Sequence, residues 1–187
     1  RAINILKNVS LIACEDTRIT RKLLTHLKIS KKLISFHKFN SLKKSEFILS
    51  KLSEGNSIAL VSDAGMPLIS DPGDSLVANA KMKKFDVICV PGPCAAITAL
   101  VSSGLQTSKF TFFGFIPKKI KERNIILKMI SNNIFTSIIY ESPKKILKLL
   151  IDLKLFCGGD RKIAILKEIT KKYESHIGNT IDEAIHI

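Results

Sequence analysis

Short apolar runs alternate with longer amphipathic stretches along this chain. In its first part, the apolar runs short enough for buried strands cover residues 9–14, 33–36, 57–62, 86–90 and 110–115. The stretches whose apolar residues recur at helical spacing cover residues 17–27, 41–52, 74–84 and 94–103. Strands that alternate with helices are typical of a mainly parallel sheet covered by helices, so the pattern predicts an α/β fold.

A second set of elements follows residues 116–119, where Ile-Pro-Lys-Lys interrupts the pattern. We predict helices over residues 122–131 and 142–156, strands over residues 136–140 and 162–169, and a last helix after the capping residue Thr180. The chain is therefore predicted to form two α/β domains, residues 1–115 and residues 116–187.

Composition limits the class of protein. No run of about 18 apolar residues occurs, so no membrane span is predicted. The four cysteines show no CxxC spacing, which favours a reduced, cytoplasmic protein without a zinc site or a disulfide framework. No group of potential ligands has metal-binding spacing, so no metal is predicted.

The net charge of +14 has two interpretations. Lysine and arginine neutralise phosphates, so the charge fits a polyanionic partner such as RNA. An A/T-rich genome would also raise the lysine content without any function, and lysine accounts for 25 of the 30 basic residues. The total charge leaves both interpretations open, and the placement of the basic residues has to decide.

The most informative segment is the loop of residues 62–73, Ser-Asp-Ala-Gly-Met-Pro-Leu-Ile-Ser-Asp-Pro-Gly, between a predicted strand and a predicted helix. Its glycines and prolines are typical of an irregular, stiff loop. Open α/β sheets bind ligands at the carboxyl ends of their strands. Asp63 and Asp71 suit ribose hydroxyls or a cation better than they suit a phosphate.

A second candidate site is the turn of residues 15–18, Glu-Asp-Thr-Arg, at the end of another predicted strand. Asp16 is placed to cap the following helix, which carries Arg21, Lys22 and Lys28 on one face. Such a face is either a solvated surface or a grip for phosphates beside two carboxylates. Two of the five arginines, Arg18 and Arg21, lie within four residues of each other here, which codon usage does not explain, so we favour a function.

Three further segments carry weaker signals. Residues 36–40, Phe-His-Lys-Phe-Asn, mix aromatic and basic groups that suit unpaired bases; Phe36 is more simply a core residue, while His37 and Asn40 stay open. Residues 90–96 are either a tight strand-to-helix turn or a place where a flat ligand approaches the backbone. Residues 140–143 and 167–171 are polar groups at strand ends.

Taken in this order, the segments resemble the ribosomal RNA small subunit methyltransferase I group of the tetrapyrrole methylase superfamily, over essentially the whole chain. The matching strings are Glu-Asp-Thr-Arg at 15–18, Thr-Arg-Lys-Leu-Leu at 20–24, Ser-Asp-Ala-Gly at 62–65, Ile-Ser-Asp-Pro-Gly at 69–73, Pro-Gly-Pro at 91–93, Ser-Gly-Leu at 103–105, Gly-Phe at 114–115, Tyr-Glu-Ser-Pro at 140–143 and Glu-Ile-Thr-Lys at 168–171.

The resemblance implies two α/β domains with a cofactor cleft between them. It implies methyl transfer from S-adenosyl-L-methionine to the ribose 2′-hydroxyl of a decoding-centre cytidine in 16S rRNA, within the 30S subunit, and a homodimer. The cofactor residues that it implies are Asp63, Ala64, Gly65, Ile69, Ser70, Asp71, Cys94, Ala95, Tyr140 and Lys167. We assign Glu15, Asp16 and Arg18 to catalysis, with Glu15 or Asp16 as proton acceptor, and Arg18, Arg21, Lys22, His37 and Asn40 to RNA binding.

The chain also departs from the group. Members usually begin with a strand and a Pro/Gly loop and end with a closing strand, so we interpret this chain as a fragment. Met66 and Cys94 stand where a small hydroxyl residue is common. A corrinoid or porphyrin-precursor methylase and a non-catalytic RNA-binding factor on the same scaffold stay open, whereas the lack of GxGxxG argues against an oxidoreductase.

Overall fold

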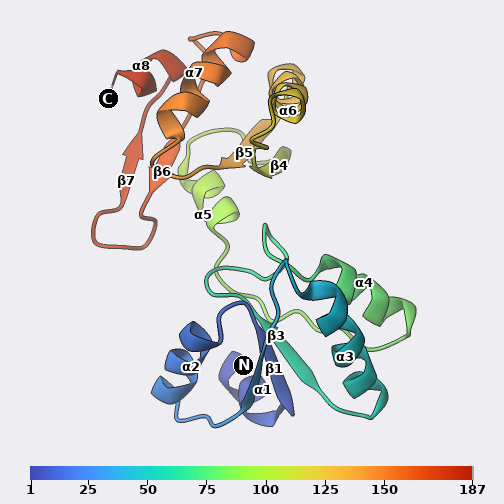
Figure 1. Ribbon diagram of the computed structural model, residues 1–187. Coiled ribbons are helices and arrows are strands. Elements are labelled where there is room, and N and C mark those ends of the chain that lie inside the picture. Colours follow the sequence, from blue (N-terminus) through green and yellow to red (C-terminus); the bar gives the residue numbers. More distant parts are fainter. Residues whose placement is uncertain (187) are drawn as a thin grey trace. The chain divides into compact units, whose positions relative to one another are not determined.

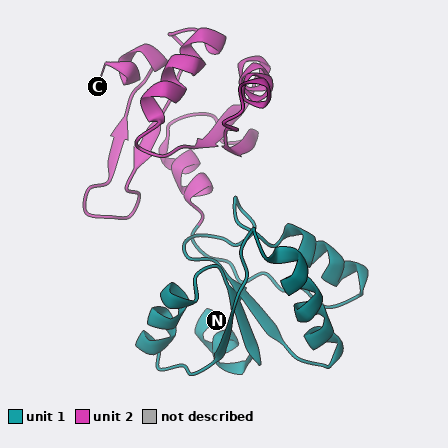
Figure 2. Cartoon of the chain, in the orientation of Figure 1, with its two compact units in different colours: residues 1–93 teal, residues 94–187 magenta. Residues whose placement is uncertain are grey.

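The computed structural model describes residues 1–186 of the protein. The chain divides into two compact units, residues 1–93 and residues 94–187, which Figure 2 shows in different colours. None of the helices in the described part is long and apolar enough to cross a membrane.

Unit 1 is built on a parallel three-stranded sheet (Figure 1). Its elements are α1 (Ala2–Asn8), β1 (Leu11–Cys14), α2 (Thr17–His26), β2 (Lys32–Ser35), α3 (Ser41–Ser53), β3 (Ile58–Val61) and α4 (Asp74–Met82). The strand order is β2-β1-β3, with Leu11 opposite Lys32 on one side and Ile58 on the other. The central strand β1 is buried along its whole length, as its apolar sequence predicts.

The two faces of this sheet carry separate cores, because consecutive strand residues point to opposite faces. Ala13 packs in a cluster with Phe36 and Ile48, which covers one face with α3 and α4. Its neighbour Ile12 packs in a second cluster with Leu6 and Leu24, which covers the other face with α1 and α2. The prediction that Phe36 is a core residue is confirmed, since only 1% of its surface is exposed.

Unit 2 combines a parallel strand pair with an antiparallel hairpin. Its elements are α5 (Ala95–Ser102), β4 (Phe110–Phe115), α6 (Ile120–Asn132), β5 (Thr136–Tyr140), α7 (Ile146–Cys157), β6 (Ile165–Lys167), β7 (Ser175–Ile177) and α8 (Ile181–Ile185). β4 pairs with β5 in parallel, and β6 pairs with β7 in antiparallel orientation. Leu127, Leu149 and Ile181 bring α6, α7 and α8 into one core.

The boundary between the units follows Pro93, whereas the sequence analysis placed a domain boundary after Phe115. The physical reason lies in long-range contacts that the local pattern does not reveal. β4 pairs with β5, and Ala96 and Leu100 of α5 pack against Ile138 of β5. Residues 94–115 therefore belong with the elements that follow them.

Several predicted elements differ from the structure. Residues 86–90 form no ladder with any described strand and are largely exposed, so the strand predicted there is wrong. The helix predicted from residue 142 begins at Ile146, after a turn in which Lys145 N donates to Ser142 O. The strand predicted over residues 162–169 is reduced to Ile165–Lys167, and its partner Ser175–Ile177 was not predicted.

Helix α2 buries a different face from the one that its apolar residues suggest. Leu24 is buried, but Ile19 and Leu23 are 45% and 44% exposed, while the polar Thr20 is buried. Thr20 is one turn before Leu24, so the two residues share the face that packs on the sheet. The exposed side of α2 consequently mixes apolar with basic residues.

Candidate functional site

Three of the predicted segments meet at the carboxyl edge of the sheet in unit 1. Because β1, β2 and β3 are parallel and in register, the turns that follow them lie at the same edge. Glu15 and Asp16 follow β1, His37 follows β2, and Asp63 follows β3. Residues up to 47 positions apart in the chain are thereby brought together.

A hydrogen bond ties the turn after β1 to the loop after β3. The backbone N–H of Asp16 donates to Asp63 Oδ1 at 3.1 Å. Asp63 therefore fixes the start of α2 relative to the acidic loop. The sequence analysis assigned Asp63 only to a cofactor, and this positioning contact was not predicted.

Asp16 is the N-cap of α2, as predicted, and its carboxylate is fully engaged by Arg18. Its Oδ1 accepts from the backbone N–H and from Nε of Arg18 at 2.8 and 3.0 Å, and its Oδ2 accepts from Nη2 at 2.6 Å. These bonds from Arg18 lower the pKa of Asp16 to about 2. A carboxylate with so low a pKa is a weak proton acceptor.

Glu15 has the opposite environment. Although Glu15 is an exposed residue, partial desolvation raises the pKa of its carboxyl group, the negative charges of Asp71 and Asp63 raise it further, and His37 lowers it. Within residues 1–186, Glu15 makes no hydrogen bond or ion pair through its side chain. The pKa of Asp71 is raised as well, first by burial, while a hydrogen bond with Ser62 lowers it. With Asp16, four carboxyl groups thus gather at this edge, and the Ser62 hydroxyl lies among them.

The acidic loop is folded back on itself by Ser62, a residue that the sequence analysis assigned no role. Ser62 Oγ donates to the carbonyl oxygens of Ala64 and Gly65 at 3.4 and 3.2 Å. Leu68 and Ser70 have positive φ angles of 73° and 66°, which non-glycine residues adopt at a cost. The position of Ser62 directly before the string Asp-Ala-Gly was the signal that could have identified it.

His37 and Asn40, both assigned to RNA binding, lie together and are bonded to each other. Asn40 Oδ1 accepts from the backbone N–H of His37 at 2.9 Å, and the Asn40 amide nitrogen lies 3.1 Å from His37 Nε2. Both side chains are half-buried. By contrast, Arg18, Arg21 and Lys22 are exposed on α2.

In unit 2, the structure brings Cys94, Ala95 and Tyr140 together. The hydroxyl oxygen of Tyr140 accepts from the backbone N–H of Ala96 at 3.1 Å, in the first turn of α5. Phe112 and Phe115 make edge contacts with the Tyr140 ring. Cys94 is the N-cap of α5, but its side chain makes no capping hydrogen bond. Lys167 lies elsewhere, exposed in the β6–β7 hairpin.

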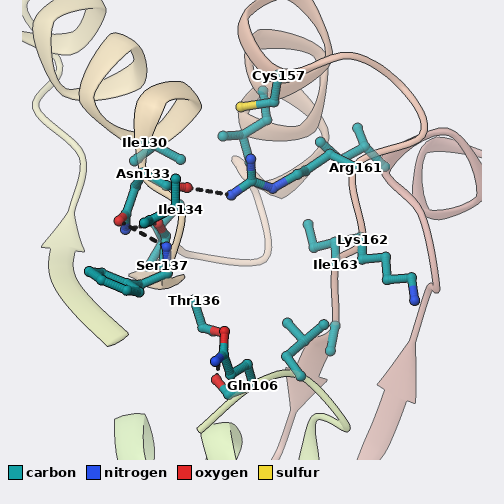
Figure 3. Close-up of a pocket in the computed structure, with 16 residues that line it drawn as sticks. Gln106, Ile130, Asn133, Ile134, Thr136, Ser137, Cys157, Arg161, Lys162 and Ile163 are labelled. Carbon is teal, nitrogen blue, oxygen red and sulfur yellow. Dashed lines mark hydrogen bonds between the residues drawn. The ribbon is translucent and has the colours of Figure 1, made fainter. Parts of the chain in front are cut away.

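A cavity of about 350 Å³ in unit 2 contains none of the predicted site residues (Figure 3). Apolar side chains of the helical core line one side of it. Its polar groups largely bond to one another: Arg161 donates to Asn133 O at 3.0 Å, Asn133 donates to Ser137 Oγ, and Thr136 donates to Gln106 O. We assign no ligand to this cavity. Across residues 1–186, no three His, Cys, Asp or Glu side chains are arranged to hold a metal ion.

Sequence comparison finds relatives that match almost the whole chain. A protein of Halalkalibacterium halodurans named ribosomal RNA small subunit methyltransferase I is 46% identical over 186 residues, which are 100% of this chain and 64% of that protein. Proteins of the same name from Escherichia coli O157:H7 and Mycoplasmopsis pulmonis are 44% and 42% identical, and the alignments cover 99% of this chain and 65% and 82% of those proteins. The chain thus spans less than two thirds of the first two relatives.

Two solved structures share the fold at low sequence identity. A cobalamin biosynthetic enzyme, cobalt precorrin-4 methyltransferase, aligns with a TM-score of 0.66 and 14% identity over 97% of this chain and 79% of that one. Diphthine synthase aligns with a TM-score of 0.70 and 12% identity over 99% and 77%. The predicted α/β fold is confirmed by both neighbours.

The sequence profile of the family described as Tetrapyrrole (Corrin/Porphyrin) Methylases matches residues 1–185. This match and the 42% identity to a relative of which the chain covers 82% agree with the resemblance inferred from the acidic loop and the turn after β1. This chain belongs to the tetrapyrrole methylase family.

Proposed function

We propose that this chain belongs to an S-adenosyl-L-methionine-dependent methyltransferase that acts on 16S rRNA and methylates the ribose 2′-hydroxyl of a decoding-centre cytidine. The observation that carries this proposal is the gathering of Glu15, Asp63 and Asp71 at the sheet edge where exposed arginines of α2 begin. The names of the relatives support ribosomal RNA as the substrate.

The acidic loop fits a cationic, nucleoside-containing cofactor. Asp63 and Asp71 supply acceptors for ribose hydroxyls and for positive charge, and Ile69 is 39% exposed and offers an apolar contact to a base. A Cβ atom placed on Gly65 would meet only Pro93 O, at 3.9 Å, so the backbone there is open to a flat ligand. Ala64 and Ser70 belong to the same loop of unit 1. Cys94, Ala95, Tyr140 and Lys167 of unit 2 are proposed as further cofactor residues on the resemblance alone.

S-adenosyl-L-methionine, when bound, supplies an electrophilic methyl group on a positively charged sulfur. The contribution of this chain is then to orient the hydroxyl and to accept its proton. We assign proton acceptance to Glu15, because its carboxylate is not engaged by a cation and lies beside His37 and two further carboxyl groups. Asp16, held by three donors of Arg18, acts as a positioning residue.

We propose the exposed face of α2 as the surface that binds the phosphates of the RNA backbone. Within the described residues, Arg21 and Lys22 make no ion pair, whereas Arg18 is oriented by Asp16 at 2.6 Å. Arg18 can still present its outer N–H groups to a phosphate, because 87% of its side chain is exposed. His37 and Asn40, which follow β2, are proposed as further RNA-binding residues. The proposal extends to the 30S subunit as the physiological partner, to a homodimer and to action in the cytoplasm.

The test is methyl incorporation by a chimera in which this chain replaces the matching segment of the Halalkalibacterium halodurans relative. The chimera is incubated with labelled S-adenosyl-L-methionine and either unmodified 30S subunits or a porphyrin precursor. The proposal predicts label in the RNA and none in the tetrapyrrole. Label in the tetrapyrrole alone would reverse the substrate class, and label in neither would leave a non-catalytic RNA-binding factor as the better account.

A further inference from the structure

The loop of residues 168–174, between β6 and β7, carries an exposed aromatic side chain flanked by cations. Tyr173 is 70% exposed, and Lys171 and Lys172 beside it are also exposed. Lys172 Nζ lies 5.5 Å from the centre of the Tyr173 ring. Of this hairpin, only Lys167 at the end of β6 has a place in the proposed function.

The backbone of this loop is held in a conformation that its residues disfavour. Glu168 and Thr170 have positive φ angles of 55° and 66°, although neither is a glycine. Residues kept in such a region need support from their surroundings, and they are concentrated at functional segments. The strained backbone therefore indicates that the conformation of this loop serves a function.

The support comes from Glu174. Its Oε2 accepts from the backbone N–H of Thr170 at 2.5 Å, and its Oε1 lies 3.3 Å from His176 Nε2. Two backbone bonds close the loop further: Lys171 N donates to Glu168 O at 2.8 Å, and Glu174 N donates to Lys171 O at 3.1 Å. The loop therefore presents Tyr173 from a preorganised frame, which lowers the entropy lost on binding.

The exposed groups of the loop indicate which class of ligand it can bind. Both of its carboxylates are used internally, Glu174 by the bonds above and Glu168 by an ion pair with Lys171 at 3.7 Å. The two lysines and two glutamates of the loop balance in charge, but the Lys171 side chain is 68% exposed against 38% for Glu168, and Lys172 makes no ion pair among the described residues. The outward face therefore presents lysine ammonium groups and an aromatic ring, with no second large exposed apolar side chain in the loop to build a protein interface. An unpaired nucleotide offers the matching chemistry, a base face for stacking and phosphates for the lysines.

We propose that residues 168–174 form a second RNA contact, in which Tyr173 stacks on an unpaired base while Lys171 and Lys172 neutralise adjoining phosphates. The contact is additional to the basic face of α2. The identity of the RNA as ribosomal rests on the proposed function.

The experiment measures binding of the full chain to a fluorescent single-stranded RNA covering the decoding region of 16S rRNA, by anisotropy at several salt concentrations. The variants are Tyr173→Ala, Tyr173→Phe and the double variant Lys171→Gln/Lys172→Gln. The matched control is Lys81→Gln/Lys83→Gln, two exposed lysines at the end of α4. Circular dichroism checks that each variant is folded.

Tyr173→Ala should weaken binding about tenfold, and Tyr173→Phe should retain it, because stacking needs only the ring. For the lysine double variant, the slope of the logarithm of the binding constant against the logarithm of the salt concentration should become shallower by about 1.4, which is near 0.7 for each lost phosphate contact. The control variant should change this slope less. Equal affinity of Tyr173→Ala and the unchanged chain would overturn this inference and leave the proposed function standing. Absence of RNA binding by the unchanged chain, or binding to anionic vesicles instead, would overturn both.

Discussion

At the residue scale, two neighbouring carboxyl groups differ because of their surroundings. Asp16 caps α2 and is neutralised by Arg18, whereas Glu15 is partly desolvated and lies near Asp71 and Asp63. The adjacent residues Glu15 and Asp16 do not reveal this difference in pKa from sequence alone. It depends first on the hydrogen bonds of Arg18 to Asp16 and on the partial desolvation of Glu15, and then on the charges of Asp71 and Asp63.

We predict that Glu15→Gln slows single-turnover methyl transfer by the chimera about 100-fold, because the variant cannot accept a proton. The matched variant Asp16→Asn should lose less than about tenfold, since asparagine also caps helices. A quenched-flow assay with saturating S-adenosyl-L-methionine measures both rates. Full activity of Glu15→Gln would remove Glu15 as the proton acceptor.

The same change should raise the melting temperature at pH 7. The pKa of Glu15 is raised in the folded protein, so ionising this group costs stability as the pH rises above its ordinary value of 4.5. A neutral glutamine avoids this cost. The advantage of Glu15→Gln should therefore disappear below pH 4.5, and calorimetry between pH 4 and pH 8 can follow it. An advantage that is independent of pH would contradict the assigned cause.

Gly73 provides a second test at this scale. Its φ angle is +136°, and a Cβ atom there would lie 2.8 Å from Leu60 Cδ2. Gly73→Ala should lower the free energy of unfolding by about 2–4 kcal/mol, from strain and overpacking together. Gly55→Ala is the matched control: its φ is +83° but nothing lies within 4 Å, so about 1 kcal/mol is expected. Urea denaturation measures the free energy of unfolding of both variants. Equal losses would show that Leu60 moves aside without cost and would contradict the overpacking.

At the element scale, the apolar pattern predicted most helices and strands within a few residues. The failures among the strands share one cause, which is that strands depend on partners distant in sequence. Residues 86–90 have a strand-like sequence but no described neighbour to pair with, and the short β7 is recognisable only beside β6. Likewise, the positive φ angle of Thr170 accompanies a hydrogen bond from its backbone N–H to Glu174, a loop contact that no propensity encodes.

The pairing of α6 with α7 yields a prediction at this scale. Arg123 donates to Asp152 Oδ2 from Nε at 2.7 Å and from Nη2 at 2.6 Å, and its side chain is only 13% exposed. Arg123→Ala should destabilise unit 2 by about 1–3 kcal/mol, because a partly buried carboxylate loses its partner. The exposed pair of Lys119 and Glu122, 3.4 Å apart, is the control, and Glu122→Gln should cost less than about 0.5 kcal/mol. Chemical denaturation measures the free energy of unfolding of both variants, and similar losses for Arg123→Ala and Glu122→Gln would contradict a structural role for Arg123.

At the scale of the whole molecule, the chain consists of two units with separate cores. The clusters around Ala13 and Ile12 lie entirely in unit 1, and those around Leu127 and Ala96 lie entirely in unit 2. The alternation of strands and helices predicted this α/β class. The boundary after Pro93 was not predictable from the same pattern, because it depends on α5 packing against β5.

The segment that joins the units should be the first site of limited proteolysis. Residues 86–93 are exposed, apart from the half-buried Val90, and make no ladder hydrogen bonds among the described residues. Subtilisin at low concentration should produce two fragments that meet between residues 85 and 93, as mass spectrometry of the first products can determine. First cuts within residues 1–85 or after residue 93 would contradict the division.

The most direct test of the central claim is the chemical identity of the methylated nucleotide. The chimera is incubated with unmodified 30S subunits and S-adenosyl-L-methionine, and the 16S rRNA is digested and analysed by mass spectrometry. The account predicts one new 2′-O-methylcytidine in the decoding region, absent when Glu15→Gln is used for the same short time. A methyl group on a base, or no methylated ribose from a chimera that binds the cofactor, would contradict it.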